Sequence, residues 1–382
     1  MHDLIVDVLA KEQSRQTCTI ELIASENFAS KAVRDLCGSI FTNKYAEGYP
    51  SKRYYNGCEH MDEIESLAID TACDIFDCRF ANVQPHSGVN ANTAVYQALL
   101  KPGDTIIGMD LASGGHLSHG APPTLSGKVY NAHTYGVGDD GYINYDEVRD
   151  LALKHKPKMI VAGASAYPRQ IFWKAFRNIA DEVGAYLLCD MAHYSGLVAG
   201  KVYNSPLPYA DVVTSTTHKT LRGPRGGIIL WNNPDYTKKI NSAIFPGTQG
   251  GPLMNIIAAK AQCFLEALEP EFRSYTEEVI KSARAVAKSF INNDYQVATG
   301  GTDSHIVLID LSNKNISGRK AADLLEYHGI TVNKNGVPND PRSFVETSGI
   351  RIGTAAEVTR GHDSEWFSNL GNRMSAILDA GS

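Results

Sequence analysis

Short apolar segments alternate with helical patterns along most of the chain. Six segments have the length and composition of buried strands and occupy residues 80–83, 105–109, 159–163, 185–190, 212–215 and 227–231. Between several of them, apolar residues recur at helical spacing, over residues 90–100, 145–154 and 173–183. Continuous apolar strands separated by helices are typical of a mostly parallel sheet with helices on both faces. The pattern therefore predicts an α/β fold.

The segments on either side of this alternation have other patterns. Residues 4–36 are helical and then extended, and apolar residues at helical spacing predict a helix over 60–76. A long amphipathic helix is predicted after residue 252. A smaller α+β pattern follows, with a strand at 305–310, a helix at 318–328 and strands near Ile330 and Ile350. We predict an N-terminal arm, a large domain and a small C-terminal domain, with boundaries that give 1–36, 37–270 and 271–382.

Composition and charge exclude several classes of protein. The 382 residues are 43% hydrophobic and 20% charged, which is enough to bury a sizeable core in two or three domains. No apolar run approaches the roughly 18 residues of a membrane span, and residues 1–16 lack the apolar stretch of a signal peptide. The net charge of -6 comes without a block of Lys and Arg, which argues against binding to nucleic acid or anionic membranes.

The seven cysteines contain no C-x-x-C pair. An odd number of cysteines without metal-ligand spacing argues against a disulfide framework and against a zinc site. We therefore predict buried thiols in a reducing compartment, a cytoplasmic location and no metal site.

A lysine follows the predicted strand 212–215, within a segment rich in hydroxyls and glycines, 214–227 (TSTTHKTLRGPRGG). Lys219 thus stands at the carboxyl end of a parallel strand, where ligands of α/β proteins bind. A lysine among polar neighbours can form a Schiff base with a carbonyl compound, and the glycines and hydroxyls suit the close approach of a phosphate. Taken alone, an ordinary surface-loop lysine is the commoner explanation.

An aspartate ends the predicted strand 185–190, and His193 follows three residues later. A carboxylate in this position can hold a protonated ring nitrogen, which makes a pyridinium a stronger electron sink. A metal ligand or a strand-end cap is the alternative explanation of Asp190.

Two further loops that follow strands carry candidate binding residues. Ser87 and Gly88 open a predicted helix, where free N–H groups bind phosphate, although the same residues also cap ordinary helices. His116, in the loop 113–119 (SGGHLSH), has a ring that could stack on a planar cofactor, the alternative being a structural histidine. Together, a Schiff-base lysine, a pyridinium partner, a phosphate cradle and a stacking ring point to pyridoxal 5′-phosphate (PLP).

Eight segments carry a resemblance to a known family: 21–27 (ELIASEN), 43–50 (NKYAEGYP), 53–55 (RYY), 82–88 (NVQPHSG), 190–193 (DMAH), 216–226 (TTHKTLRGPRG), 250–252 (GGP) and 347–351 (TSGIR). They resemble the serine hydroxymethyltransferase family, over nearly the whole chain. The resemblance implies a fold-type I PLP-dependent transferase, with a mostly parallel, seven-stranded sheet in the large domain and a small α+β domain. It also implies a homodimer or a dimer of dimers, with active sites shared between subunits.

The resemblance implies roles for residues around the cofactor. Lys219 is similar to the Schiff-base lysine, Asp190 to the partner of the pyridine nitrogen, and His116 to the ring stacked on the cofactor. Further cofactor-binding residues implied in the same way are Tyr45, Ser87, Gly88, Ser165, His193, Thr216 and His218, with Gly250 and Gly251 reaching the phosphate from the other subunit.

Substrate contacts are implied by the same resemblance. Arg351 and Ser25 are similar to the pair that holds the substrate carboxylate, for which a guanidinium offers a planar two-donor fork. Glu47 is similar to the acid–base carboxylate near the substrate hydroxyl, and Tyr45 and Tyr55 to active-site tyrosines. Composition alone would also allow their Tyr- and Gly-rich loop to be ordinary surface packing. Folate contacts would involve Leu111, Gly115, His116, Leu117 and Asn335.

The sequence also departs from the family's pattern. Val89 stands where many relatives have Ser, which removes one hydroxyl from the phosphate site. Phe172 replaces a usually acidic residue, and 343–347 (SFVET) rearranges a familiar segment close to the expected folate pterin. The chain ends at Ser382, before the family's usual final helical segment. We expect these departures to bear on cofactor affinity, folate recognition and stability.

The implied activity is the reversible transfer of the serine hydroxymethyl carbon to tetrahydrofolate, leaving glycine. One alternative is a folate-independent PLP aldolase or transaldolase of β-hydroxy amino acids, to which a member altered near Phe344 could have diverged. Folate dependence of glycine α-proton exchange distinguishes the two. A second alternative is a catalytically silent RNA-binding or scaffold protein, against which the intact Lys219, Asp190, His116 and Arg351 argue.

Overall fold

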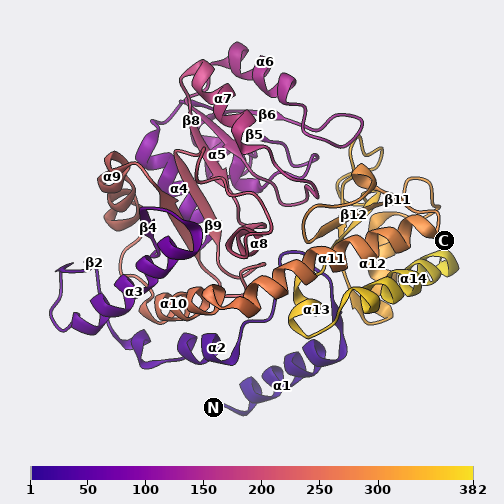
Figure 1. The fold of residues 1–382 in the computed structure, drawn as a ribbon, viewed down its shortest axis with the longest axis horizontal. Coiled ribbons are helices and arrows are strands. Elements are labelled where there is room, and N and C mark those ends of the chain that lie inside the picture. Colours follow the sequence, from indigo (N-terminus) through magenta and orange to yellow (C-terminus); the bar gives the residue numbers. More distant parts are fainter. Residues whose placement is uncertain (1, 382) are drawn as a thin grey trace.

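Seven strands form the central sheet of the larger part of the molecule (Figure 1). The computed structural model describes residues 2–381. The departure from the family's pattern that was noted at Ser382 lies outside these residues. The strands lie in the order β4 (Phe80–Asn82), β10 (Gly227–Trp231), β9 (Val212–Thr216), β8 (Tyr186–Asp190), β7 (Met159–Ala162), β5 (Thr105–Met109) and β6 (Asn131–Tyr135). Strands β9, β8, β7, β5 and β6 pair in parallel, and β10 is antiparallel to both of its neighbours. The predicted α/β fold with a mostly parallel sheet is confirmed.

Adjacent residues of the strands enter two different apolar clusters, one on each face of the sheet. Ile106 packs with α4 on one face, and Ile107 packs into the main core on the other. This explains why the strands read as continuous apolar runs, since both of their faces are buried. The sequence missed β6 because its side chains are mostly exposed or half-buried, with only Tyr135 buried.

Helices cover both faces of this sheet (Figure 1). They begin and end as follows: α3 (Glu59–Phe76), α4 (Gly88–Leu99), α5 (Leu125–Val129), α6 (Tyr145–His155), α7 (Trp173–Val183), α8 (Ser195–Ala199), α9 (Thr237–Ser242) and α10 (Met254–Leu268). The helices predicted at 60–76, 90–100, 145–154 and 173–183 correspond to α3, α4, α6 and α7. Their ends differ from the prediction by at most two residues.

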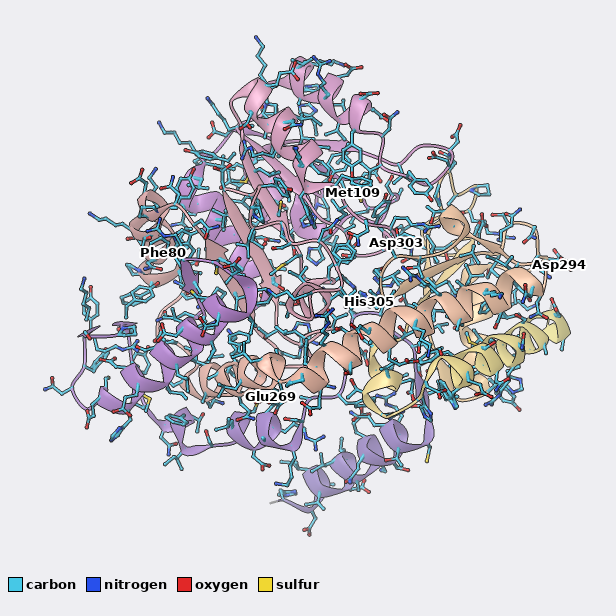
Figure 2. The ribbon with its side chains drawn as sticks, viewed as in Figure 1. Phe80, Met109, Glu269, Asp294, Asp303 and His305 are labelled. Carbon is cyan, nitrogen blue, oxygen red and sulfur yellow. The ribbon has the colours of Figure 1, made fainter. Side chains whose placement is uncertain are left out.

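The predicted long helix is two helices, α10 and α11 (Pro270–Asn292), separated by Glu269 (Figure 2). Glu269 is extended, with φ of -71° and ψ of 146°, because a residue that precedes a proline avoids the helical region. The break at Glu269 adjoins the predicted boundary between residues 270 and 271. The domain limits themselves stay a prediction.

A second, antiparallel sheet follows α11, in the order β11 (Gln296–Val297), β12 (Ile306–Asp310), β15 (Gly349–Gly353) and β14 (Asn333–Asn335). The remaining helices of this part are α12 (Gly318–Tyr327), α13 (Ala355–Thr359) and α14 (Ser364–Gly381). Helices α11 and α14 lie side by side (Figure 1). This arrangement agrees with the smaller α+β pattern predicted after residue 300.

The N-terminal arm is tied to this second part. Helix α1 (Asp3–Cys18) has no buried residue, and its Leu4, Ile5 and Val8 are exposed. After it, β1 (Ile20–Glu21) pairs in parallel with β13 (Ile330–Thr331), and α2 (Lys31–Cys37) follows. No helix within residues 2–381 combines the length and the apolar character needed to cross a bilayer.

The prediction of buried thiols was only partly right. Cys58, Cys189 and Cys263 are buried, but Cys18 is exposed at the end of α1, and Cys37, Cys73 and Cys78 are half-buried. The number and spacing of the cysteines do not show which of them are buried. Cys18 is exposed because it lies in a helix with no buried residue.

Candidate active site

A cavity of about 480 Å³ lies where the carboxyl ends of the parallel strands face the second sheet. Asp190 ends β8, Thr216 ends β9, and Arg351 reaches the cavity from β15. The cavity brings together eleven of the residues predicted for the site: Ser25, Ser87, Gly88, His116, Ser165, Asp190, His193, Thr216, His218, Lys219 and Arg351. These residues come from seven separate loops, strands and strand ends, as expected of a ligand site at this edge of an α/β sheet.

Lys219 is held with its amine facing this cavity. Its backbone oxygen accepts hydrogen bonds from Asn27 Nδ2 at 3.0 Å and from the Arg222 N–H at 2.9 Å, which fix the turn after β9. The side chain is 8% exposed, and its Nζ has no hydrogen-bond partner among residues 2–381. Burial lowers the pKa of Lys219 to about 8; the Asp190 charge opposes this shift, and Arg351 and Arg225 add to it. The amine is therefore much closer to its neutral, nucleophilic form at pH 7 than an exposed lysine.

Asp190 is held as a carboxylate by three hydrogen bonds. Its Oδ2 accepts from His119 Nε2 at 3.0 Å and from Asn92 Nδ2 at 2.9 Å, and its Oδ1 accepts from the Ala192 N–H at 3.0 Å. Burial acts to raise the pKa of Asp190, but the hydrogen bonds and nearby imidazoles hold it well below its ordinary value. The cavity thus contains a fixed negative charge, which can bind a protonated ring nitrogen.

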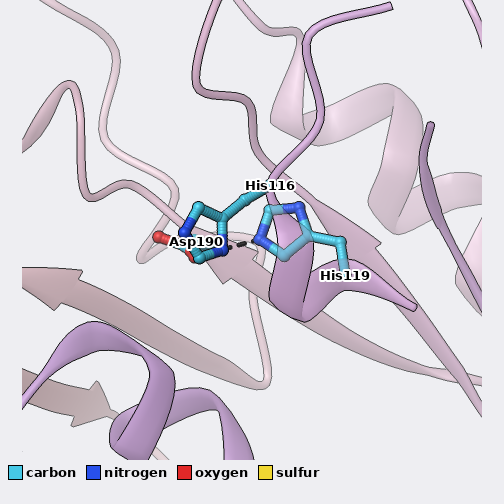
Figure 3. A group of neighbouring side chains, drawn as sticks. All are labelled: His116, His119 and Asp190. Carbon is cyan, nitrogen blue, oxygen red and sulfur yellow. Dashed lines mark hydrogen bonds and ion pairs between the residues drawn. The ribbon is translucent and has the colours of Figure 1, made fainter. Parts of the chain in front are cut away.

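His116, His119 and Asp190 form a compact group whose potential ligand atoms lie within 4.8 Å of one another (Figure 3). The bonding of these side chains favours a hydrogen-bonding role for Asp190 over the alternative of a metal ligand. His119 Nε2–H donates a hydrogen bond to the carboxylate, so this protonated nitrogen has no lone pair to offer a metal. His116 Nδ1 is hydrogen-bonded to Ser118 Oγ at 2.7 Å, and burial lowers the His116 pKa to about 4, which keeps its ring neutral. The arrangement suits a hydrogen-bonded carboxylate beside a neutral aromatic ring.

Another part of the cavity, around the N-terminus of α4, has features of an anion site. Ser87 caps α4, with its Oγ accepting from the Asn90 N–H at 3.2 Å. A Cβ atom on Gly88 would lie 2.8 Å from Thr216 Cγ2, so the close approach of the two segments requires glycine. His218 Nδ1 is buried without a hydrogen-bond partner among the described residues, which indicates a polar ligand in this place. A phosphate at the N-terminus of α4 would satisfy these groups.

Arg351 joins the second sheet to the cavity. Its Nη1 donates to the Ser165 carbonyl at 2.6 Å and its Nε to Asn333 Oδ1 at 2.9 Å. Burial lowers the Arg351 pKa to about 10, which leaves the guanidinium charged at neutral pH. Two of its nitrogens are thus held by the protein, and the remaining N–H groups are available for a carboxylate.

His193 is a buried, neutral neighbour of Lys219. Burial is the main cause of its lowered pKa, and the charges of Lys219 and Arg351 add to the shift. Its ring stacks on that of His305, with 5.5 Å between centroids, and His193 Nδ1 lies 3.4 Å from His305 Nε2. His305 stands where the two parts of the chain meet (Figure 2).

Five predicted residues form a second cluster outside this cavity. A Cβ atom on Gly250 would lie 3.4 Å from Glu47 Oε1, and one on Gly251 would lie 3.0 Å from Tyr45 Cζ. The Tyr45 and Tyr55 rings meet edge to face at 5.4 Å, and the Glu47 charge raises the Tyr55 pKa. Tyr45 and Tyr55 are about half exposed, at 56% and 48%. In one chain the residues predicted for the cofactor and for serine therefore form two groups.

The loop that carries this second cluster is anchored by a buried ion pair. It contains the hairpin of β2 (Gly48–Tyr49) and β3 (Lys52–Arg53). The Arg53 guanidinium contacts Glu65 at 2.6 Å and Asp62 at 2.8 Å, and it donates to the Gly48 carbonyl at 3.1 Å. Glu65 also accepts a hydrogen bond from Gln84 at 2.7 Å, which links the loop to the segment after β4. This exposed, tyrosine-rich loop thus has a defined position.

The sequence comparisons agree with this geometry. The model of the serine hydroxymethyltransferase family matches residues 1–374 of the chain. The chain belongs to the serine hydroxymethyltransferase family. The serine hydroxymethyltransferase of Wolbachia pipientis wMel is 57% identical over 371 residues, which cover 97% of this chain and 87% of the relative. That of Halorhodospira halophila is 58% identical over 369 residues (96% and 89%), and that of Orientia tsutsugamushi 59% over 376 residues (98% and 88%).

Membership of the serine hydroxymethyltransferase family confirms the resemblance predicted from the eight sequence segments, and with it the fold-type I architecture. The structure shows where departures from the family's pattern lie. Val89 lines the cavity beside Gly88 and is 48% exposed. Phe172 stands at the N-cap of α7 and makes no side-chain cap bond, so the helix loses the acceptor that an acidic residue would supply. Phe344 is 74% exposed in the rearranged loop.

Of the residues expected to contact folate, only His116 lines the 480 Å³ cavity. Leu111, Gly115 and Leu117 lie on the same loop as His116, and Leu117 is 50% exposed. Asn335 borders a separate, smaller space, to which Ser113 and Gly114 also contribute.

Four residues of the site were missed as functional residues by the sequence analysis. Asn92 and His119 bind Asp190, Arg225 lines the cavity, and His305 supports His193. Asn92 offered a signal, since it is a polar residue flanked by Ala91 and Ala94 on a helix face that is otherwise apolar. His305 offered none, because it directly precedes β12 of the second sheet, more than a hundred residues after His193.

Proposed function

We propose that the chain transfers the hydroxymethyl carbon of serine to tetrahydrofolate, with PLP as cofactor. The products would be glycine, 5,10-methylenetetrahydrofolate and one water molecule. The observation that carries this proposal is the cavity that buried Lys219 lines together with the Asp190 carboxylate and the Arg351 guanidinium. The relatives that match nearly the whole chain are also serine hydroxymethyltransferases.

The residues of the cavity fit PLP at each of its functional groups. Lys219 would hold the cofactor covalently through Nζ, and Asp190 would bind the protonated pyridine nitrogen. His116 would lie on the ring, with Ser165 and His193 near the phenolic oxygen. The phosphate would meet the orphaned His218 Nδ1, Ser87 and Gly88 at the N-terminus of α4, and Thr216. Bound PLP would supply an electron sink for bonds that break at the substrate α-carbon.

The chain's own residues would place the substrate and move its protons. Arg351, together with Ser25, would hold the serine carboxylate, because the guanidinium is buried and stays charged. Lys219, with its lowered pKa, would exchange a proton near neutral pH once the substrate amine has taken its place. Glu47 would move a proton at the serine hydroxyl, with Tyr55 beside it.

The proposal includes a homodimer in which each site uses residues of both subunits. It is supported by the two groups of site residues in one chain: Tyr45, Glu47, Tyr55, Gly250 and Gly251 lie together, yet none of them lines the Lys219 cavity. A second copy would bring this cluster to the cavity. The exposed apolar residues of α1 are consistent with a further contact between copies. The proposal covers a homodimer and a dimer of such dimers.

Subunit mixing tests the shared site. Lys219→Ala and Glu47→Gln are each expected to reduce transfer activity strongly. When the two variants are unfolded and refolded together, a mixed dimer contains one site with both residues intact. Random assortment then restores about one quarter of the wild-type sites. If mixing restores no activity, each site belongs to a single chain.

Serine cleavage with and without tetrahydrofolate tests the reaction itself. We expect glycine formation from serine to require folate, and the glycine α-proton to exchange much faster when folate is present. Full exchange without folate would support the folate-independent aldolase instead. Lys219→Ala should leave the fold intact, remove the cofactor's lysine-dependent visible absorbance and eliminate turnover. Lys201→Ala, which removes an exposed lysine, is the matched control.

The folate contacts and the cellular location complete the proposal. Leu111, Gly115, His116 and Leu117 share one loop beside the cavity, which supports a folate site there. Asn335 would complete it. A cytoplasmic location is consistent with the seven cysteines, all of which are free thiols.

A further inference from the structure

Lys260 is a buried lysine that the proposed reaction does not use. It lies in α10 and is 1% exposed. Its Nζ donates to three backbone carbonyls, those of Val83 at 2.6 Å, Gly227 at 2.8 Å and Pro85 at 3.0 Å. Burying a lysine is costly unless its charge is compensated, so this position calls for a physical explanation.

The three carbonyls belong to two segments that meet at the phosphate end of the cavity. Val83 and Pro85 lie between β4 and the Ser87 cap of α4. Gly227 begins β10, two residues after Arg225, which lines the cavity. The Gly227 N–H also donates to the Pro85 carbonyl at 3.0 Å. The ammonium group of Lys260 therefore joins the two segments that carry Ser87 and Arg225.

These segments are packed so tightly that a small displacement of one would shift the other. A Cβ atom on Gly226 would lie 2.5 Å from Lys260 Cε, and one on Gly227 would lie 2.3 Å from the Ser87 carbonyl. Residues 83–86 belong to no strand or helix, so side chains must satisfy their backbone groups. Gln249 donates to the Gln84 carbonyl and accepts from the His86 N–H, both at 2.9 Å, and the Gln84 N–H donates to Asn82 Oδ1 at 3.0 Å. Lys260 donates to the Val83 and Pro85 carbonyls.

The charge of Lys260 is balanced chiefly by these carbonyl dipoles. Glu65, the buried acid whose charge acts on it, accepts its own hydrogen bonds from Arg53 and Gln84. Burial lowers the Lys260 pKa to about 7, and the Glu65 charge opposes this shift. Three carbonyl oxygens around one ammonium group favour its protonated form and resemble the surroundings of a bound monovalent cation.

We propose that Lys260 is a positioning residue for the cofactor phosphate. Its ammonium group fills a cage of three backbone carbonyls and thereby sets the position of Ser87 and Arg225. The proposal rests on the proposed binding of PLP to this cavity. It predicts that loss of the ammonium group weakens binding of the phosphate much more than binding of the pyridine ring.

Cofactor titrations of the cofactor-free full chain test this role. Dissociation constants for PLP and for pyridoxal, which lacks the phosphate, are measured for the wild type, Lys260→Met and Lys201→Met. Lys260→Met keeps the bulk of the side chain but removes its donors. We expect it to bind PLP about tenfold more weakly, with pyridoxal affinity little changed, since the three buried acceptors lose their partner. Lys201→Met is the matched control, because Lys201 also donates to a backbone carbonyl, but only to that of Ile75. Its affinities for PLP and pyridoxal should equal those of the wild type.

Chemical rescue tests the carbonyl cage. Lys260→Ala leaves space for a small cation, so ammonium or methylammonium should restore its preference for PLP over pyridoxal. Neither ion should restore Lys260→Met, in which the side chain fills the space. If ammonium does not restore the preference of Lys260→Ala for PLP, the proposed carbonyl cage is wrong.

The remaining outcomes also decide the proposal. An unchanged preference for PLP in Lys260→Met, or an equal loss of PLP and pyridoxal affinity, overturns the positioning role. If both variants fail to fold even with ammonium present, Lys260 supports the core and the proposal is wrong. Failure of the wild type to bind PLP contradicts the proposed function instead, so the two failures are distinguishable.

Discussion

His119 donates a hydrogen bond from Nε2 to Asp190 Oδ2 over 3.0 Å, and both side chains are buried. The bond fixes one oxygen of the carboxylate that would bind the pyridine nitrogen. With Asn92, it keeps Asp190 ionised in a place where burial alone would favour protonation. Two residues distant in sequence thus create the charge on which the proposed cofactor chemistry depends.

Replacing His119 with Phe should weaken catalysis without abolishing cofactor binding. The variant removes one of the two side-chain donors to Asp190 Oδ2, which raises the Asp190 pKa and weakens its hold on a protonated pyridine nitrogen. Loss of one donor to a buried charge costs about 1.4 kcal/mol or more, so we expect turnover to fall at least about tenfold. Steady-state kinetics and cofactor titration measure the two effects separately.

His119→Gln is the control for this prediction, because its amide can still donate to the carboxylate. It should recover part of the turnover. Wild-type turnover in His119→Phe would show that Asn92 and Ala192 suffice to hold Asp190.

The buried amine of Lys219 should make stability depend on pH. Its pKa is about 8 in the folded chain, below the ordinary value of 10.5. Below pH 8 both states carry the charge, and the folded state bears the cost of burying it. Between pH 8 and 10.5 the unfolded chain binds more protons, so this contribution to stability rises with pH.

Urea unfolding of cofactor-free protein checks the prediction. Lys219→Met should be more stable than the wild type at pH 7, and this difference should shrink between pH 8 and 10.5. Lys201→Met, at an exposed position, should show no such change. A difference that stays constant across this range would mean that the Lys219 amine titrates normally.

Arg351→Ala should raise the serine requirement far more than it weakens cofactor binding. A buried, charge-assisted contact to a carboxylate is worth ~2–5 kcal/mol when its partner is left unpaired, which corresponds to roughly 30-fold or more in the serine KM. The structure adds that the guanidinium is held by Ser165 and Asn333, so it is already oriented before substrate binds.

Arg351→Lys keeps the charge but loses the planar fork, so it should have an intermediate serine requirement. PLP titration of the same variants completes the test. Equal losses of serine and PLP affinity would place Arg351 at the cofactor instead of the substrate.

Glu47→Gln should bind serine normally and yet lose ~10²–10⁴-fold in folate-dependent cleavage, the usual contribution of a positioned acid–base group. The variant keeps the shape of the side chain and removes its proton exchange. Cleavage of 3-phenylserine without folate should suffer less, because its benzylic leaving group needs less assistance. Glu59→Gln, at an exposed position on α3, is the control. Wild-type serine cleavage by Glu47→Gln would remove the carboxylate from the mechanism.

The sequence by itself determined the central sheet and most of its helices. Strands such as β5 and β10 are apolar at nearly every position because both faces of the sheet are covered. Such strands can be recognised in the sequence without knowing which strands lie beside them. It missed β6, an edge strand with exposed side chains, and it merged α10 with α11, whose separation depends on Pro270 and the extended Glu269 before it.

The chemistry of individual strand ends was also evident from the sequence, since Lys219, Asp190 and His116 each follow an apolar strand. Only the tertiary structure decided which groups act on them. Hydrogen bonds and burial depend on residues far apart in the chain: His119 and Asn92 hold Asp190, and Lys260 meets three carbonyls of two separate segments. The division between the Lys219 cavity and the Glu47 cluster likewise follows from packing, because local patterns carry no information on which loops meet in space.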